Sequence, residues 1–121
     1  MLSSIFKFFT ASPVSSEAAM ATAKELVETA ISENKIMIFS KSTCPYCRRA
    51  KALFAAQFPD EKPVVFELNE REDGADIQNY LAVKTGQRTV PNIFVNKKHV
   101  GGNDDTQAAF KTGQLAQLVK A

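Results

Sequence analysis

The chain has two cysteines, and they are its residues best suited to chemistry. Two residues separate them in the segment Cys44-Pro45-Tyr46-Cys47, a spacing at which two thiols can form a disulfide and exchange it with another molecule. Three other interpretations stay open: half of a zinc site, a static disulfide, or two unreactive packed thiols. A zinc site is short of ligands because His99 is the only histidine. A disulfide across four residues would constrain the unfolded chain little.

The position of the pair predicts that the two thiols differ. A short apolar strand is expected at Lys35–Ser40 and a helix directly after Cys44, so Cys44 begins that helix. Unpaired backbone N–H groups and the positive end of the helix dipole favour a thiolate there. Three cations nearby favour it further: Lys41, Arg48 and Arg49. Cys47 falls on the apolar stripe of the helix, so we expect Cys44 to be the nucleophile and Cys47 a less exposed resolving thiol.

The elements around the pair alternate between helix and strand. Apolar spacing and breaker residues predict helices at 17–34, 45–58, 74–85, 104–111 and 114–120. They predict strands at 35–40, 63–68, 90–95 and 98–100. The two-residue link Asn96-Lys97 is typical of a hairpin, whereas strands joined through a helix run parallel. The expected fold class is therefore α/β, with a four-stranded mixed sheet flanked by helices.

Composition supports one domain and excludes two classes of partner. A chain of 121 residues suits a single core. The formal charge of +2 comes without a basic cluster, so nucleic acid is not an expected partner. No apolar run approaches the roughly 18 residues of a membrane span. We expect a monomer that does not bind membranes.

The first sixteen residues are set apart as an N-terminal extension, and 17–121 as the folded domain. The extension has five Ser, one Lys and no acid, a composition similar to mitochondrial transit peptides. A tail without any address is the alternative, because Lys7 is its single basic residue. Met20 is a candidate second start. The expected location is cytoplasmic, and a mitochondrial location through the extension stays open.

Four segments, in order, resemble a known family: Lys41–Cys47, Ala75–Gln78, Gly86–Phe94 and His99–Asp105. They are similar to segments of dithiol glutaredoxins, most like those of fungi, over about residues 20–121. The resemblance implies a thioredoxin fold and glutathione as co-substrate, with no bound cofactor and no metal. It further implies reduction of protein–glutathione mixed disulfides by Cys44 alone and of protein disulfides by Cys44 with Cys47.

The same resemblance implies a set of glutathione-binding residues. Six correspond by position to glutathione contacts in that family: Lys41, Tyr46, Gln78, Val90, Asp104 and Asp105. Pro91 corresponds to a cis-proline that faces the active site. Thr89 and Gly102 complete the candidate set.

The chemistry of glutathione gives these positions a physical reason. The tripeptide has two carboxylates and one ammonium, so its site needs a cation, an anion and accessible backbone. Lys41 suits the glycine carboxylate, and free N–H groups after Gly102 suit the γ-glutamyl carboxylate. Val90 can pair with the cysteinyl part as a short strand. Ordinary roles remain open: a solvated surface residue for Lys41, a polar helix residue for Gln78, and an edge-strand proline for Pro91. A helix cap is the alternative for Asn103 or Asp104.

Two rival functions remain. A thioredoxin-type reductase of protein disulfides would use the same cysteine pair, but the chain has no Trp and carries the charged groups just described. An iron–sulfur carrier would use Cys44 and glutathione thiols as ligands across a dimer. Pro45 stiffens the loop and Cys47 favours disulfide closure, which weighs against a cluster.

Overall fold

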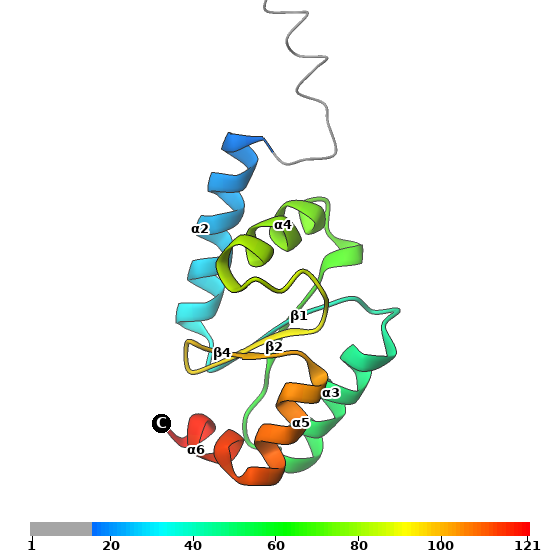
Figure 1. The fold of residues 1–121 in the computed structure, drawn as a ribbon, viewed down its shortest axis with the longest axis vertical. Coiled ribbons are helices and arrows are strands. Elements are labelled where there is room, and N and C mark those ends of the chain that lie inside the picture. Colours follow the sequence, from blue (N-terminus) through cyan, green and yellow to red (C-terminus); the bar gives the residue numbers. More distant parts are fainter. Residues whose placement is uncertain (1–15) are drawn as a thin grey trace, which may run out of the picture.

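A computed structural model describes residues 16–121 and contains one four-stranded sheet (Figure 1). The strands are β1 (Ile36–Ser40), β2 (Val64–Glu67), β3 (Asn92–Val95) and β4 (Lys98–Gly101), in the order β2-β1-β3-β4. β1 pairs in parallel with β2 and antiparallel with β3, and β3 pairs antiparallel with β4. The expected mixed sheet of four strands is confirmed.

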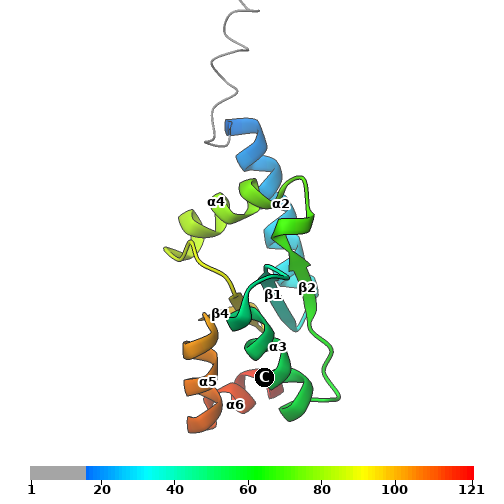
Figure 2. The ribbon, with the colours of Figure 1, turned by 90° about the vertical axis from the view of Figure 1, so that its right-hand side faces the viewer.

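Helices cover both faces of this sheet (Figures 1 and 2). They are α2 (Glu17–Glu33), α3 (Pro45–Gln57), α4 (Gly74–Thr85), α5 (Asn103–Thr112) and α6 (Gln114–Lys120). Helices α2 and α4 enclose one apolar cluster with the sheet, while α3, α5 and α6 enclose another on the opposite face. Among the described residues, no helix has the length and apolar character that crossing a bilayer requires.

Strand β1 lies between the two apolar clusters, and all five of its residues are buried. Met37 and Phe39 pack with α2 and α4, whereas Ile36 and Ile38 pack with α3, α5 and α6. Successive side chains of a strand point to opposite faces. A strand covered on both faces therefore needs apolar residues without alternation, as its sequence has.

The structure differs from the predicted elements mainly around β2 and β3. β3 begins at Asn92, so residues 90 and 91 lie in the segment before it. β2 ends at Glu67, and a single 3-10 turn that the sequence did not predict, η1 (Leu68–Glu70), follows it. The hairpin link is confirmed: Asn96 and Lys97 both have positive φ, of 46° and 70°, as a two-residue turn between antiparallel strands requires.

Helix α2 begins at the edge of the described chain. The hydroxyl Oγ of Ser16 accepts a hydrogen bond from the backbone N–H of Ala19, at 3.1 Å, and caps the helix. Met20 packs against the apolar cluster under α2 and α4. The predictions made for residues 1–15 lie outside the described residues.

Candidate active site

Cys44 is the N-cap residue of α3 and is partly exposed. Its backbone is extended, with φ −92° and ψ 120°, and its carbonyl accepts from the N–H of Arg48 at 3.2 Å. Pro45 occupies the first turn, where a missing N–H leaves no intrahelical bond unmade. Across the site, Cys44 Sγ lies 3.9 Å from the carbonyl oxygen of Val90. The expected thiol at a helix start is therefore present and faces the segment before β3.

The surroundings lower the pKa of Cys44 below its ordinary value. Partial burial raises this pKa, but the backbone N–H and thiol of Cys47, the backbone N–H of Tyr46 and the charge of Arg48 together lower it by more. Hydrogen bonds from the first turn of α3 thus contribute more than side-chain cations do. The thiolate is the reactive form of cysteine, so the geometry favours nucleophilic attack by Cys44.

Cys47 lies one turn further along α3 and is fully buried. Burial raises the pKa of Cys47, and the neighbouring Cys44 raises it further. The backbone N–H of Lys41, 3.4 Å from Cys47 Sγ, and the hydroxyl of Ser40 lower this pKa only in part. The pKa values of the two thiols are therefore shifted in opposite directions, so Cys44 ionises more readily than Cys47.

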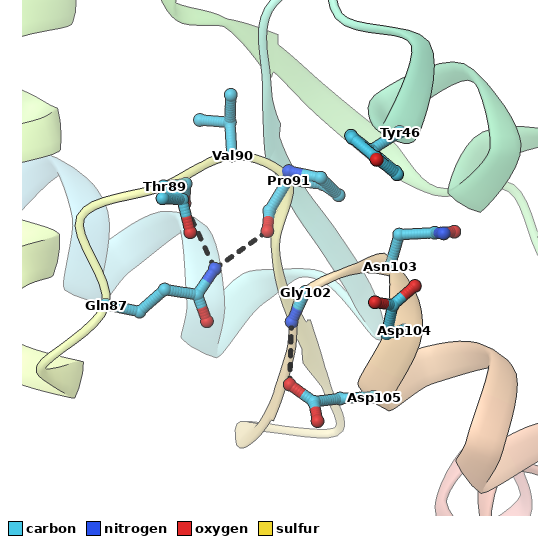
Figure 3. Close-up of a pocket in the computed structure, with 9 residues that line it drawn as sticks. All are labelled: Tyr46, Gln87, Thr89, Val90, Pro91, Gly102, Asn103, Asp104 and Asp105. Carbon is cyan, nitrogen blue, oxygen red and sulfur yellow. Dashed lines mark hydrogen bonds between the residues drawn. The ribbon is translucent and has the colours of Figure 1, made fainter.

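A pocket of about 480 Å³ is lined in part by Val90, whose carbonyl oxygen faces the Cys44 thiol. Figure 3 shows that three segments build it: the start of α3, the loop before β3, and the start of α5. Its lining residues are Tyr46, Gln87, Thr89, Val90, Pro91, Gly102, Asn103, Asp104 and Asp105. The peptide bond between Val90 and Pro91 is cis. Val90 therefore connects the pocket to the Cys44 thiol.

The structure brings together seven of the nine candidate glutathione-binding residues. They are Tyr46, Thr89, Val90, Pro91, Gly102, Asp104 and Asp105. Lys41 and Gln78 do not line the pocket. Gln78 instead donates from Nε2 to the carbonyl oxygen of Arg88, at 2.7 Å, and so holds the loop that carries Thr89.

Gln87 and Asn103 also line the pocket but were missing from the candidate set. Gln87 Nε2 donates to the carbonyl oxygens of Thr89, at 3.0 Å, and Pro91, at 2.8 Å (Figure 3). The side chain thus braces the loop beside the nucleophile. The available signal was position: Gln87 lies two residues before Thr89, and Asn103 lies directly after Gly102.

The two acidic residues at the start of α5 have different roles. Asp105 Oδ2 accepts from the backbone N–H of Gly102, at 3.2 Å, which closes the first turn of the helix. The Asp104 carboxylate is exposed at the pocket and has no hydrogen bond or ion pair within residues 16–121. The capping role that was open for Asp104 therefore belongs to Asp105.

Gly101 and Gly102 also differ in their need for glycine. Gly101 has φ +120°, and a Cβ there would lie 2.3 Å from Asp105 Oδ2. A Cβ at Gly102 would meet its nearest atom, the carbonyl oxygen of Pro91, at 3.7 Å, which is ordinary contact. Only Gly101 is confined to glycine by the backbone.

His99 is an exposed residue of β4, as its outward position in the sequence pattern predicts. Its Nε2 lies 2.8 Å from Asn92 Oδ1. The ring is partly covered by its neighbours; this partial burial lowers the pKa of His99, and Asp105 opposes the effect.

Comparisons with known proteins agree with this geometry. The family model described as Glutaredoxin matches residues 36–100. Glutaredoxin-C4 of Arabidopsis thaliana is 50% identical over 104 residues, which cover 86% of this chain and 76% of the relative. Glutaredoxin-1 of Saccharomyces cerevisiae is 48% identical over 96 residues, covering 78% of this chain and 87% of that protein. Plant and fungal relatives are thus matched at similar identity.

Solved structures give the same result for the fold. A crystal structure of a buckwheat glutaredoxin–glutathione complex superposes with a TM-score of 0.83 at 34% identity, covering 88% of this chain and 94% of the other. A solution structure of reduced glutaredoxin C1 from Populus tremula x tremuloides superposes with a TM-score of 0.80 at 32% identity, over 86% and 87% of the two chains. The expected thioredoxin fold is confirmed.

Proposed function

The chain belongs to the glutaredoxin family, and from this premise we propose how its two thiols carry out glutathione-dependent thiol–disulfide exchange. One observation carries the proposal. Cys44 begins a helix near an open pocket, and the pKa of its thiol is lowered. Cys47 is buried one turn further along the helix, and the pKa of its thiol is raised. Cys44 is therefore the nucleophile, and Cys47 acts only after a disulfide has formed at Cys44.

In the proposed reaction with a protein–glutathione mixed disulfide, Cys44 acts alone. Its thiolate attacks the glutathione sulfur, so a Cys44–glutathione disulfide forms and the bond to the protein sulfur breaks. The electron pair leaves on the protein sulfur, which takes a proton from solvent. A second glutathione thiolate then attacks the glutathione sulfur on Cys44, which yields glutathione disulfide and returns the Cys44 thiolate.

In the proposed reaction with a protein disulfide, both thiols act. Cys44 forms a mixed disulfide with one client sulfur and releases the other as a thiolate. Cys47 then attacks Cys44, the bond to the client breaks, and a Cys44–Cys47 disulfide remains for glutathione to reduce. The client gains two electrons, which the cysteine pair supplies.

We propose that the pocket described above holds glutathione. The superposed buckwheat glutaredoxin was crystallised as a complex with glutathione, which supports this proposal. The Val90 backbone, next to Cys44, suits the cysteinyl part of the tripeptide. The free Asp104 carboxylate and the start of α5 suit its γ-glutamyl end. We propose that Lys41 and Gln78, which do not line the pocket, contact the parts of glutathione that extend beyond it.

A glutathione-coupled assay tests the proposed function. Purified protein, glutathione, glutathione reductase and NADPH should reduce a peptide–glutathione mixed disulfide and consume NADPH. A parallel reaction driven by thioredoxin reductase without glutathione serves as the control. Turnover with thioredoxin reductase alone would instead support a thioredoxin-type reductase.

We propose that the protein acts as a monomer in the cytoplasm and that residues 1–19 are a candidate mitochondrial address. The acid-poor, Ser-rich composition of residues 1–16 supports the address. A fluorescent reporter fused to residues 1–19 should enter mitochondria, and a diffuse reporter would reject the address. Light scattering of the purified chain tests the monomer.

A further inference from the structure

A small polar cluster lies beneath α3, next to the buried thiol. Ser40 and Glu67 are paired residues of the parallel strands β1 and β2. They have the same strand parity as Ile38 and Val65, whose side chains pack in the cluster under α3, so they face that helix as well. Lys51 lies four residues after Cys47 on α3, on the same side of the helix, and its Nζ binds Glu67 Oε2.

Two oxygens of this cluster are buried without a formed hydrogen bond to any described residue. They are Oγ of Ser40, which is 0% exposed, and Oε1 of Glu67. Buried polar atoms are rarely left in this state. Ser40 directly precedes Lys41, whose backbone N–H lies 3.4 Å from Cys47 Sγ, and Ser40 pairs with Glu67 across the two strands. Its hydroxyl acts to lower the pKa of both the Cys47 thiol and the Glu67 carboxyl.

The Ser40 hydroxyl can donate one hydrogen bond, and two neighbouring groups can accept it: the Glu67 carboxylate and the Cys47 sulfur. A serine hydroxyl rotates freely to the better acceptor. A neutral thiol accepts weakly, whereas a thiolate is a charged and much stronger acceptor. With Cys47 protonated, Glu67 Oε1 is the better acceptor; once Cys47 ionises, its sulfur competes.

We propose that Ser40 is a positioning residue for the resolving step, whose hydroxyl turns to Cys47 Sγ as that sulfur becomes a thiolate. The proposal deepens the proposed function, because it rests on Cys47 as the resolving thiol. Lys51 binds the other Glu67 oxygen, so the carboxylate keeps its ion pair while the hydroxyl donates to Cys47.

In the resolving step, the Cys47 proton leaves to solvent, and the Ser40 hydroxyl donates a hydrogen bond to the thiolate that remains. That thiolate attacks Cys44 in the mixed disulfide, so the Cys44–Cys47 bond forms and the bond from Cys44 to the client breaks. The electron pair leaves on the client sulfur, which takes a proton from solvent.

Besides Ser40, titratable and charged residues also lie around Cys47, on its own helix and on neighbouring segments. Cys44 lies on the same helix and raises the pKa of Cys47, while Lys41 approaches through its backbone N–H. From α5, Asp104 and Asp105 are exposed and line the pocket. The Ser40 hydroxyl is the one side-chain donor among the described residues that lowers the pKa of Cys47.

Removing the hydroxyl should give a rate–pH profile that crosses the original one. Loss of a hydrogen bond to a charged group raises the pKa of Cys47 in Ser40→Ala by about one unit. Tenfold less thiolate then forms at neutral pH, but each thiolate is about threefold more nucleophilic. Resolution should therefore be about threefold slower below the pKa of Cys47 and about threefold faster above it.

Two measurements test the proposal. In the Cys44→Ser background, thiolate absorbance against pH should show a higher pKa for Cys47 in Ser40→Ala and an unshifted one in Ser40→Thr, which keeps the hydroxyl. In chains that keep both cysteines, rapid mixing with a preformed mixed disulfide at Cys44 should show the crossing profile as client thiol is released. Glu67→Gln removes a negative charge and the competing carboxylate, so it should lower the pKa of Cys47.

An unchanged Cys47 pKa in a folded Ser40→Ala protein would overturn the proposal, as would a rate reduced equally at every pH. The absorbance titration needs no substrate, so it reports on Ser40 even if Cys47 does not resolve disulfides. Full protein-disulfide reduction by Cys47→Ser would reject the proposed function of Cys47 instead.

Discussion

At the scale of single residues, the site consists of one chemical group in two environments. Cys44 gains backbone N–H groups at the start of α3, whereas Cys47 loses contact with solvent one turn later. The helix supplies the first effect, and the packing of α3 on the sheet supplies the second. The division of labour between the thiols therefore follows from their positions along one helix.

Exchange of either cysteine for serine should separate the two proposed reactions. Cys44→Ser should abolish both, because no other described cysteine is exposed. Cys47→Ser should keep deglutathionylation and lose the reduction of protein disulfides that need resolution. The glutathione-coupled assay measures both, with Thr43→Ser, an exposed neighbour, as control. Equal loss of deglutathionylation in both cysteine variants would contradict the assignment.

The pH dependence of alkylation should also distinguish the thiols. A lowered pKa means that the Cys44 thiolate is already populated below about pH 8.5, the value for a free thiol. Burial, the largest contribution to the raised pKa of Cys47, remains in the Cys44→Ser variant, so alkylation of Cys47 there should set in at a higher pH than that of Cys44. Rates of iodoacetamide labelling between about pH 4 and pH 11, followed by mass spectrometry, measure the pKa of each thiol. The reverse order would exclude Cys44 as nucleophile.

Neutralising Asp104 should weaken the binding of glutathione-containing substrates. Asp104→Asn should raise KM by up to roughly tenfold and leave kcat little changed, because the contact is remote from the reacting sulfurs and an open groove screens it. Asp60→Asn, an exposed carboxylate outside the pocket lining, is the matched control. An unaltered KM for Asp104→Asn would place the ammonium of glutathione elsewhere.

At the scale of elements, the sequence could predict what depends on local pattern. The apolar run of β1, the start of α3 at Pro45 and the two-residue hairpin all follow from neighbouring residues, and the structure has them. The pocket depends on three segments that meet only after folding. The bracing by Gln87 and the cap by Asp105 reach backbone groups only two to four residues away, but each depends on how the backbone of the loop bends, which the residue pattern does not give.

The two adjacent glycines before α5 should respond differently to alanine. Gly101→Ala should cost roughly 1–3 kcal/mol in the free energy of unfolding, because φ is +120° and the new Cβ would press on the Asp105 carboxylate. Gly102→Ala should be tolerated, since its Cβ meets only ordinary contacts. Urea unfolding of both variants measures the difference. Similar stability of the two would show that the strand end relaxes freely.

At the scale of the whole molecule, the helix that carries the two cysteines and the N-terminal helix lie on opposite faces of the sheet. The thiols belong to α3, which packs on one face, while α2 packs with α4 on the other (Figure 2). Contacts of α2 with α4 include Glu28, which accepts from Tyr80 and pairs with Lys84 at 2.8 Å. Changes in α2 should therefore alter stability more than chemistry.

A chain that starts at Met20 should show this separation. It lacks the Ser16 cap and the first turn of α2, and loss of such a cap costs about 1 kcal/mol. Its melting temperature should fall by a few degrees, with kcat and KM unchanged. A chain that starts at Ser16 is the control. Lowered activity in the folded Met20 chain would show that α2 communicates with the site.

The antiparallel pairing of β1 with β3 has a consequence for biosynthesis. On the ribosome, β1 and both cysteines emerge long before Val90 and the strand that pairs with β1. Until that later segment arrives, the sheet that buries Cys47 is incomplete, and the carbonyl that faces Cys44 is missing. A nascent chain therefore lacks the burial that raises the pKa of Cys47, and this part of the difference between the two thiols is acquired only once the last third of the protein has been made.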